Sequence, residues 1–482
     1  MLAALLLATA TQLDLPDLAL RSLAFPRRPG GSRAIALLLA PRQPRRPERA
    51  APCGPQGVAA SATLAWLAPG ASTLETTAAD LPGDARSIVA ADLDGDGTDE
   101  LLLVRPSELL VVAPQRRVLL AGSSITVAHL SEDAAPWILE RAIDRVRFRR
   151  DPAALLADLP LAPETTLRDG WLSWRTPSLL PVGRDGAGHA LFATLAQAWG
   201  PQRLRVWLFQ PEAAAEARVA ECWARLPAPE TVLESKVFLL DGEPTLLVTT
   251  KPADRLSLFG EKRLRLFPLR RDRSRRGIAP RLALETRINL WQQTVPRLLD
   301  VDGDGRSDLV LGYWKGLSGD HVVLDAYLQQ ADGGFRTAPL STSREVKQAE
   351  REVLGYGDDL DGDGRGDLFV LAAGELLLYP GLAPAHGRDL VASRPAVRLS
   401  LGEADAPVDP ERLGLEVDGG GVEPVLLGGG SRAPRVVDLD GDGRPEIVLF
   451  HGANPRQLRV VSPAAAAAAA PRGAGGSGSA RR

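Results

Sequence analysis

The chain has 482 residues, of which 45% are hydrophobic and 24% charged, and its formal net charge is −3 at pH 7. This composition is typical of a globular protein, and the length predicts one large repeat fold or two to three domains. The small net charge excludes a strong long-range field toward nucleic acid or an anionic membrane, so we expect no nucleic-acid partner.

The chain begins with residues 1–10, MLAALLLATA, which combine a short apolar run with an Ala-Thr-Ala triplet. These features indicate a secretory signal peptide, although the positive n-region is missing and the segment could instead be a first strand. A signal peptide implies a secreted, periplasmic or cell-surface protein, in which Cys53 and Cys222 could form one disulfide bridge. No other stretch is long and apolar enough for a transmembrane segment.

Four later stretches share one motif: DLDGDGTDELLLV from Asp92, DVDGDGRSDLVL from Asp300, DLDGDGRGDLFVL from Asp359 and DLDGDGRPEIVLF from Asp438. Each has Asp at positions 1, 3 and 5, Gly at position 6 and an acid at position 9. Weaker copies of the same apolar–turn–apolar outline occur at Gly30, Asp185 and Asp241. Aligned on position 5, the seven units lie at residues 30, 96, 185, 241, 304, 363 and 442.

The short apolar runs that follow these loops are bounded by Gly, Pro and Asp, which favours strands over helices. A repeat of about 60 residues with about four strands is one blade of a β-propeller. The sequence therefore predicts an all-β fold, a seven-bladed β-propeller over residues 11–462. We expect one short helical insertion at residues 136–159 and loops or extra strands near residues 380–430. Residues 463–482 are expected to form a disordered Ala/Gly/Ser-rich tail.

The acids of the motif repel one another unless a cation lies among them. Calcium takes six to eight oxygen ligands, and alternate Asp side chains of one loop can point at a common centre. Position 7 can add its backbone carbonyl, position 9 can close the shell, and Gly at position 6 permits the sharp turn. The sequence thus predicts about four Ca²⁺ ions, one in each loop. The expected ligands are Asp92, Asp94, Asp96, Thr98 and Glu100; Asp300, Asp302, Asp304, Arg306 and Asp308; Asp359, Asp361, Asp363, Arg365 and Asp367; and Asp438, Asp440, Asp442, Arg444 and Glu446.

Magnesium is less favoured than calcium, because it prefers a few carboxylates plus several waters. Two other interpretations of these loops are an EF-hand and a metal-free turn. An EF-hand needs a bidentate Glu at position 12, but that position is Leu103, Leu311, Val370 or Leu449, so an EF-hand is excluded. Hairpin turns without a metal are the other alternative. It is favoured for Asp241 and Asp185, where no metal is expected.

The four loops resemble the FG-GAP (VCBS-type) repeat, the blade unit of the integrin α-subunit propeller. The resemblance is strong at these loops and reduced to an outline at the three weaker units, and it spans roughly residues 15–462. It implies a propeller whose hairpin loops hold structural calcium through positions 1, 3, 5, 7 and 9. The Phe-Gly and Gly-Ala-Pro elements are poorly kept in FHGANP (450–455) and YPGLAP (379–384). The resemblance thus supports the fold and the metal, and not a receptor function.

Other signals are weaker. The RGD triplet at 365–367 includes Asp367, whose carboxylate should face the ion and not an adhesion partner. The five histidines are scattered and form no metal or catalytic motif. The basic stretch 259–281 is either a polyanion contact or, as we favour, a solvated strand pair with its loop. We therefore expect a monomeric binding or adhesion module for an unknown protein or glycan. The alternatives are a propeller enzyme, a carbohydrate lyase or hydrolase, and a purely structural module of a larger surface assembly.

Overall fold

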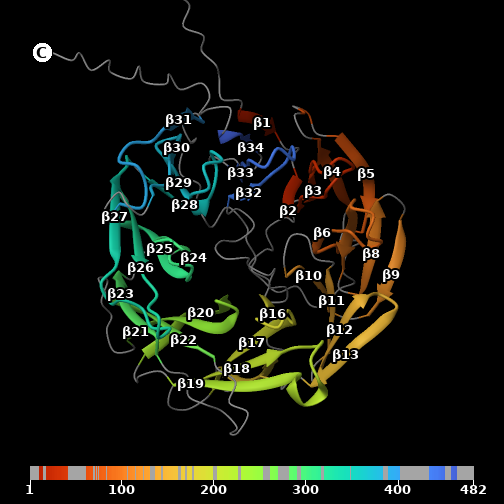
Figure 1. Ribbon diagram of the computed structural model, residues 1–482. Coiled ribbons are helices and arrows are strands. Elements are labelled where there is room, and N and C mark those ends of the chain that lie inside the picture. The colour runs from red at the N-terminus through yellow and green to blue at the C-terminus, as the bar shows by residue number, and fades with distance from the viewer. Residues whose placement is uncertain are drawn as a thin grey trace, which may run out of the picture.

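The strands of the chain assemble into a ring of four-stranded antiparallel sheets, in which the first strand of each sheet is innermost (Figure 1). This computed structural model describes the following residues: 10–14, 18–41, 61–68, 71, 73, 75–82, 84–105, 107–113, 116–122, 124–130, 136–142, 145–160, 164–168, 171–175, 179–198, 203–225, 230–252, 261–269, 282–289, 295–315, 320–347, 349–383, 389–401, 434–450 and 457–463.

The first half of the ring comprises four blades. Blade 1 consists of β2 (Leu18–Ala24), β3 (Ile35–Pro41), β4 (Ala62–Leu67) and β5 (Glu75–Leu81). Blade 2 consists of β6 (Ser87–Ala91), β7 (Glu100–Val104), β8 (Glu108–Ala113) and β9 (Arg117–Ala121). Blade 3 consists of β10 (Ile125–Ala128), β11 (Trp137–Arg141), β12 (Arg145–Asp151) and β13 (Ala154–Pro160). A separate two-stranded sheet follows, with β14 (Glu164–Arg168) and β15 (Trp171–Arg175). Blade 4 consists of β16 (Leu179–Arg184), β17 (Ala190–Ala198), β18 (Arg203–Phe209) and β19 (Val219–Arg225), with the short 3₁₀ helix η1 (Ala215–Ala217) before its last strand.

The second half comprises four more blades. Blade 5 consists of β20 (Glu230–Leu240), β21 (Glu243–Pro252), β22 (Glu261–Pro268) and β23 (Leu284–Asn289). Blade 6 consists of β24 (Val295–Leu299), β25 (Asp308–Lys315), β26 (His321–Tyr327) and β27 (Leu340–Glu345). Blade 7 consists of β28 (Ala349–Asp358), β29 (Asp367–Ala372), β30 (Glu375–Tyr379) and β31 (Val397–Ser400). Blade 8 consists of β32 (Arg435–Val437), β33 (Glu446–Phe450), β34 (Gln457–Val461) and the N-terminal strand β1 (Ala10–Asp14).

In the described residues the core is divided among eight clusters of buried side chains, and each cluster lies between two neighbouring blades. Along β3, Ala36 and Leu38 pack on blade 2, whereas Leu37 and Leu39 pack on blade 8. Since both faces of a radial sheet are covered, its strands are continuous apolar runs, which is the pattern of the sequence. The cluster between blades 8 and 1 closes the ring.

The ring is also closed by strand exchange between the two ends of the chain. Strand β1 pairs antiparallel with β34, from Ala10 opposite Val461 to Asp14 opposite Gln457. The N-terminal segment thereby supplies the outermost strand of the last blade, which ties the first blade to the last without a covalent bond. Residues 1–9 lie outside the described residues, so the signal peptide stays a prediction.

The blade count corrects the sequence prediction, because the ring has eight four-stranded sheets and not seven. The missing unit is blade 3, which lies in the long step between residues 96 and 185. The predicted helical insertion at 136–159 is wrong, since this stretch forms β11, β12 and most of β13. Its alternation of arginines with Val146 and Phe148, both 0% exposed at the blade 3–4 interface, is the period-2 signal that identifies a strand.

The seven units predicted from the sequence all correspond to blades of the ring. Each unit predicted from the sequence contains a hairpin between the first two strands of a blade, and the all-β assignment is confirmed. Loops or extra strands were expected near residues 380–430, and strand β31 lies there. Residues 402–433 and the tail from 464 lie outside the described residues. No helix in the described part of the chain is long and apolar enough to cross a membrane.

Candidate metal centres

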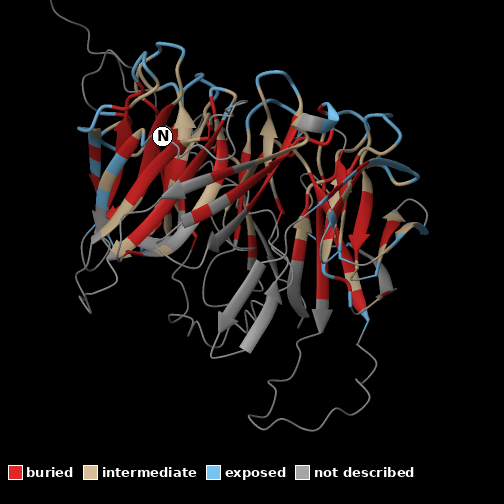
Figure 2. Ribbon diagram, turned by 90° about the horizontal axis from the view of Figure 1, so that it is seen from below, coloured by how far each residue is buried: buried red, intermediate tan, exposed pale blue. Residues whose placement is uncertain are grey.

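The four acid-rich loops occupy the same place in four different blades. They join β6 to β7, β24 to β25, β28 to β29 and β32 to β33, which is always the first hairpin of the blade. Because the first strands of all blades run in the same direction, these hairpins emerge on one face of the ring. Figure 2 shows exposed loops along that edge of the molecule. Position 9 is in every case the first residue of the second strand.

The Asp at position 1 organises each loop through backbone hydrogen bonds. In blade 2 the two carboxylate oxygens of Asp92 accept from Gly95 N at 2.7 Å and from Gly97 N at 3.0 Å. The same pair of bonds recurs in the other three loops at 2.7–2.9 Å. The glycines at positions 4 and 6 have φ between +78° and +85°, a conformation that a β-carbon disfavours. Sequence reasoning assigned this role to position 6 and missed position 4.

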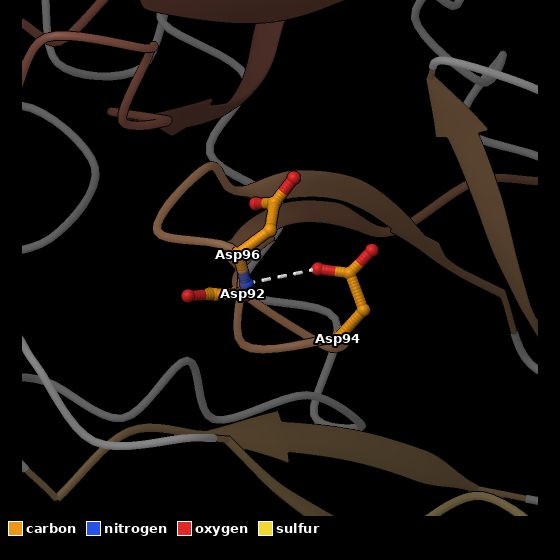
Figure 3. Close-up of side chains that lie close together, drawn as sticks. All are labelled: Asp92, Asp94 and Asp96. Atoms are coloured by element: carbon orange, nitrogen blue, oxygen red, sulfur yellow. Dashed lines mark hydrogen bonds between the residues drawn. The ribbon is translucent and has the colours of Figure 1, made fainter.

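The Asp side chains at positions 3 and 5 fold back onto the loop in the same way. Asp94 accepts a hydrogen bond from Asp96 N at 3.1 Å, and Asp96 accepts one from Thr98 N at 2.7 Å. Figure 3 shows Asp92, Asp94 and Asp96 on this one turn, with the bond from Asp96 N to Asp94 dashed. Corresponding bonds form in the other three loops, so all four turns adopt one conformation.

The carboxylates of each loop converge. In every loop, three of them have oxygens within 4.8 Å of one another. The groups are Asp92, Asp94 and Asp96; Asp300, Asp302 and Asp304; Asp359, Asp361 and Asp367; and Asp438, Asp440 and Glu446. These all-oxygen donor sets suit a hard cation such as calcium, which binds oxygen at about 2.3–2.6 Å.

The acid at position 9 belongs to the convergent groups of blades 7 and 8 only, and it is buried in three of the four loops, whereas Glu100 is half-buried. Asp308 is 0% exposed, Asp367 4% and Glu446 6%. Burial raises the pKa of Glu100, Asp308 and Glu446, and it raises the pKa of Asp367 to about 6. An ionised carboxylate in such a place is costly without a counter-charge, and a bound dication would supply one. The residues therefore fit the ion that the motif implies.

In blades 6 and 7 the position 9 Asp also links the loop to the connection between the third and fourth strands of its own blade. Asp308 accepts hydrogen bonds from Val301 N at 3.0 Å and from Gln329 N at 2.8 Å. Asp367 accepts from Leu360 N and from Gly381 N, both at 2.8 Å. The carboxylate of the RGD triplet is thus turned inward, as expected, and is not presented to a partner.

In blades 6 and 7 the arginine at position 7 has a contact that sequence reasoning did not assign. Arg306 forms an ion pair with Asp304, and the guanidinium of Arg365 lies 3.1 Å from the carboxylate of Asp363. These arginines partly neutralise the position 5 acids. The expected role of the position 7 carbonyls as ligands stays a prediction.

The weaker units are ordinary hairpins in the described residues. Asp241 and Gly242 form a two-residue turn, with Leu240 opposite Glu243 and φ of +49° and +79°. In blade 4, Asp185 accepts hydrogen bonds from Ala187 N and His189 N. Neither Asp belongs to a convergent acid group among the residues that the structure describes, and the expectation of no metal there stays a prediction.

The remaining candidates are not brought together. His129, His189 and His321 lie in or beside blades 3, 4 and 6, and His386 and His451 lie outside the described residues. Cys222 is buried in β19, and Cys53 lies outside the described residues. The favoured solvated reading of 259–281 is wrong for Arg265, which is 1% exposed in β22; residues 270–281 are not described.

Comparison with known proteins adds little to this geometry. No protein-family model matches the chain, and no curated protein matches it. Among solved structures, Sqt1 from Chaetomium thermophilum is 12% identical, with 94% of this chain and 98% of that chain covered and a TM-score of 0.45. Drosophila Semaphorin 1b, extracellular domains 1–2, is 9% identical, with 76% and 86% covered and a TM-score of 0.33. The propeller assignment rests instead on the chain's own strand pairing and interface clusters.

A rise in pH should affect the calcium-free and the calcium-loaded protein in opposite ways. The position 9 acid of blade 7, Asp367, is the group that predicts this difference. The pKa of Asp367 is about 6 in the fold and lies near 3.8 in an unfolded chain. The folded state therefore holds this proton more tightly, and without calcium the free energy of unfolding should fall as pH rises from about 4 to about 6. With calcium the carboxylate must ionise to bind, so the stabilisation by the ion should grow over the same range.

Denaturant titrations at several pH values, in metal-free buffer and in millimolar calcium, measure both trends. The matched variant is Asp367→Asn, in which the contribution of this group to both slopes should disappear. Identical pH profiles for wild type and variant would refute the assignment.

Proposed function

We propose that the chain is a calcium-stabilised eight-bladed propeller that acts as a binding or adhesion module outside the cytoplasm, for a protein or glycan ligand. The observation that carries the proposal is the repetition of one loop geometry in four blades on one face of a closed ring. In each loop three carboxylates converge to within 4.8 Å of one another. Calcium would be structural there, since all the expected ligands of one ion come from a single hairpin.

Residues at positions 1, 3, 5 and 9 of the loops would hold the ions through carboxylate oxygens, and position 7 through its carbonyl. The chemistry that calcium supplies is charge neutralisation, which lets the loop carboxylates stay ionised side by side. Binding of a partner would then use side chains that the fixed hairpins and the neighbouring loops present.

Calcium titration calorimetry tests the metal, with an expected stoichiometry of about four. A glycan array, screened with the full chain in millimolar calcium and again after chelation, tests the ligand class. Binding of a glycan that depends on calcium supports the proposal. A measured stoichiometry of zero would overturn the calcium sites. Equal glycan binding before and after chelation would show that ligand binding does not depend on calcium.

A further inference from the structure

Blade 1 is unusual among the blades next to the metal loops because its own first hairpin contains no acid. This hairpin, residues 25–34 with the sequence FPRRPGGSRA, lies between two acid-rich loops. Blade 2 flanks it on one side and blade 8 on the other, and blade 8 is held to the chain's N-terminal end by β1. What fixes the blade 1 hairpin therefore bears on how the ring stays closed.

On the blade 2 side, the hairpin contacts the acid-rich loop through Arg27 and Asp99. Asp99 is position 8 of the loop and is not an expected ligand. Its carboxylate accepts from Arg27 N at 2.7 Å, from Nε at 3.2 Å and from Nη2 at 3.1 Å. In return, Asp99 N donates to Arg27 O at 3.1 Å. The guanidinium also lies 3.9 Å from Asp92, the position 1 acid.

On the blade 8 side, the contact is made by backbone atoms. Arg33 N donates to the carbonyl of Leu439 at 2.6 Å. Leu439 is position 2 of the blade 8 loop, and its own N–H donates to the position 9 acid Glu446 at 2.8 Å. The backbone of Leu439 is thus hydrogen-bonded both to the expected ligand Glu446 and to Arg33 of the blade 1 hairpin. Gly441 and Gly31 also approach closely, since a Cβ at Gly441 would lie 3.4 Å from the carbonyl carbon of Gly31.

We propose that the acid-rich loops of blades 2 and 8 clamp the hairpin of blade 1, so that calcium binding in these two loops is coupled to closure of the ring. The inference rests on the proposed calcium sites. The carboxylates of each loop repel one another, and a bound dication would offset this repulsion and hold the loop in the observed shape. A loop held in one shape keeps Asp99 and Leu439 where Arg27 and Arg33 reach them.

Coupling of this kind is reciprocal in free energy, so the docked hairpin should raise calcium affinity at both loops by the factor with which calcium stabilises docking. Such factors are typically about 5 to 150. The charge of Arg27 does not cancel this effect, because Asp99 already neutralises it at hydrogen-bond distance.

The two amide hydrogens in the contacts are direct reporters. Hydrogen exchange, resolved to single amides in the full-length protein, should slow at Arg27 and at Arg33 by about fivefold or more when calcium is added. With Asp92→Asn and Asp94→Asn together, the response at Arg27 should be lost and that at Arg33 kept. With Asp438→Asn and Asp440→Asn together, the reverse is expected.

The matched control is Asp300→Asn with Asp302→Asn, which removes the same two positions from the blade 6 loop and should leave both responses intact. Arg27→Met combined with Asp99→Asn removes the ion pair and keeps every expected ligand in place. It should lower the calcium affinity of the blade 2 loop. Arg105→Met removes another ion pair of blade 2, the one between Arg105 and Asp84, and should leave calcium affinity unchanged.

The outcomes separate the two proposals. If calorimetry detects no bound calcium, the metal sites themselves fail. If calcium binds to wild type but neither amide slows, or if the blade 6 variant loses the responses as fully as the others, the clamp is refuted and the sites stand.

Discussion

Removal of calcium is expected to lower the free energy of unfolding by about 5–6 kcal/mol. This figure assumes a dissociation constant of about 0.1 mM at each site, for which ~1 mM calcium stabilises the folded state by roughly 1.4 kcal/mol per site. Four sites together are then comparable with the total stability of a typical protein. Since the unfolding entropy scales with length, the melting temperature should fall by about 6 °C on chelation. Calorimetry with and without chelator measures the change.

Two Asp variants in blade 6 provide the matched comparison. Asp300→Asn removes the position 1 ligand and should abolish about a quarter of the calcium effect. Asp332→Asn alters an exposed Asp that accepts a hydrogen bond from Gly334 N in another turn of the same blade, and it should leave the calcium effect unchanged. A melting temperature that does not respond to chelation would remove the case for structural calcium.

Replacement of Arg265 by Ala is expected to destabilise the fold by about 3–5 kcal/mol. Arg265 is 1% exposed and bonds to residues of the three other strands of blade 5. Its Nη1 and Nη2 donate to Glu230 at 2.5 and 3.0 Å, Nη1 to Thr250 at 3.0 Å, and Nε to Glu285 at 3.0 Å. Without the guanidinium, Glu230 becomes a buried carboxylate whose main partner is lost. Equilibrium unfolding in denaturant measures the cost.

The control is Arg398→Ala, which removes an arginine from an exposed ion pair with Glu375 at 3.5 Å and should cost less than about 1 kcal/mol. Burial by itself raises the pKa of Glu230, but the hydrogen bonds from Arg265 and Thr250 outweigh it and the net pKa is lowered. Replacement of both partners, Arg265→Met with Glu230→Leu, should recover part of the loss because no buried charge is then stranded. If Arg265→Ala lowered the free energy of unfolding no more than Arg398→Ala does, the buried ion pair would not stabilise the fold as proposed.

The buried ion pair shows why part of the sequence was misread. Arg263 and Arg265 lie in a basic stretch, and charge runs usually face water. The partner of Arg265 is Glu230, which is 35 residues earlier in the chain and reaches it through the order of strands in the sheet. Nothing local in the sequence marks that pairing.

Blade 3 was missed for a related reason. Its first hairpin carries no acid motif, and its charged strands resemble an amphipathic helix when only apolar spacing is considered. The period-2 alternation around Val146 and Phe148 was available in the sequence, but a count of the acid loops could not reveal it. The pairing of β10 to β13 and the interface clusters on both sides of the blade establish that a complete sheet lies there.

The sequence by itself determined the local features: strands from short apolar runs, and four identical turns from acids and glycines at fixed spacing. These features depend on interactions within about ten residues, so a single stretch of chain specifies them. The tertiary structure alone decided the number of blades, the exchange of β1 into blade 8 and the contacts of Arg27 and Arg33 with neighbouring loops. Each of these depends on which sheets pack together around the ring, and that choice is made by the summed burial of all eight interfaces.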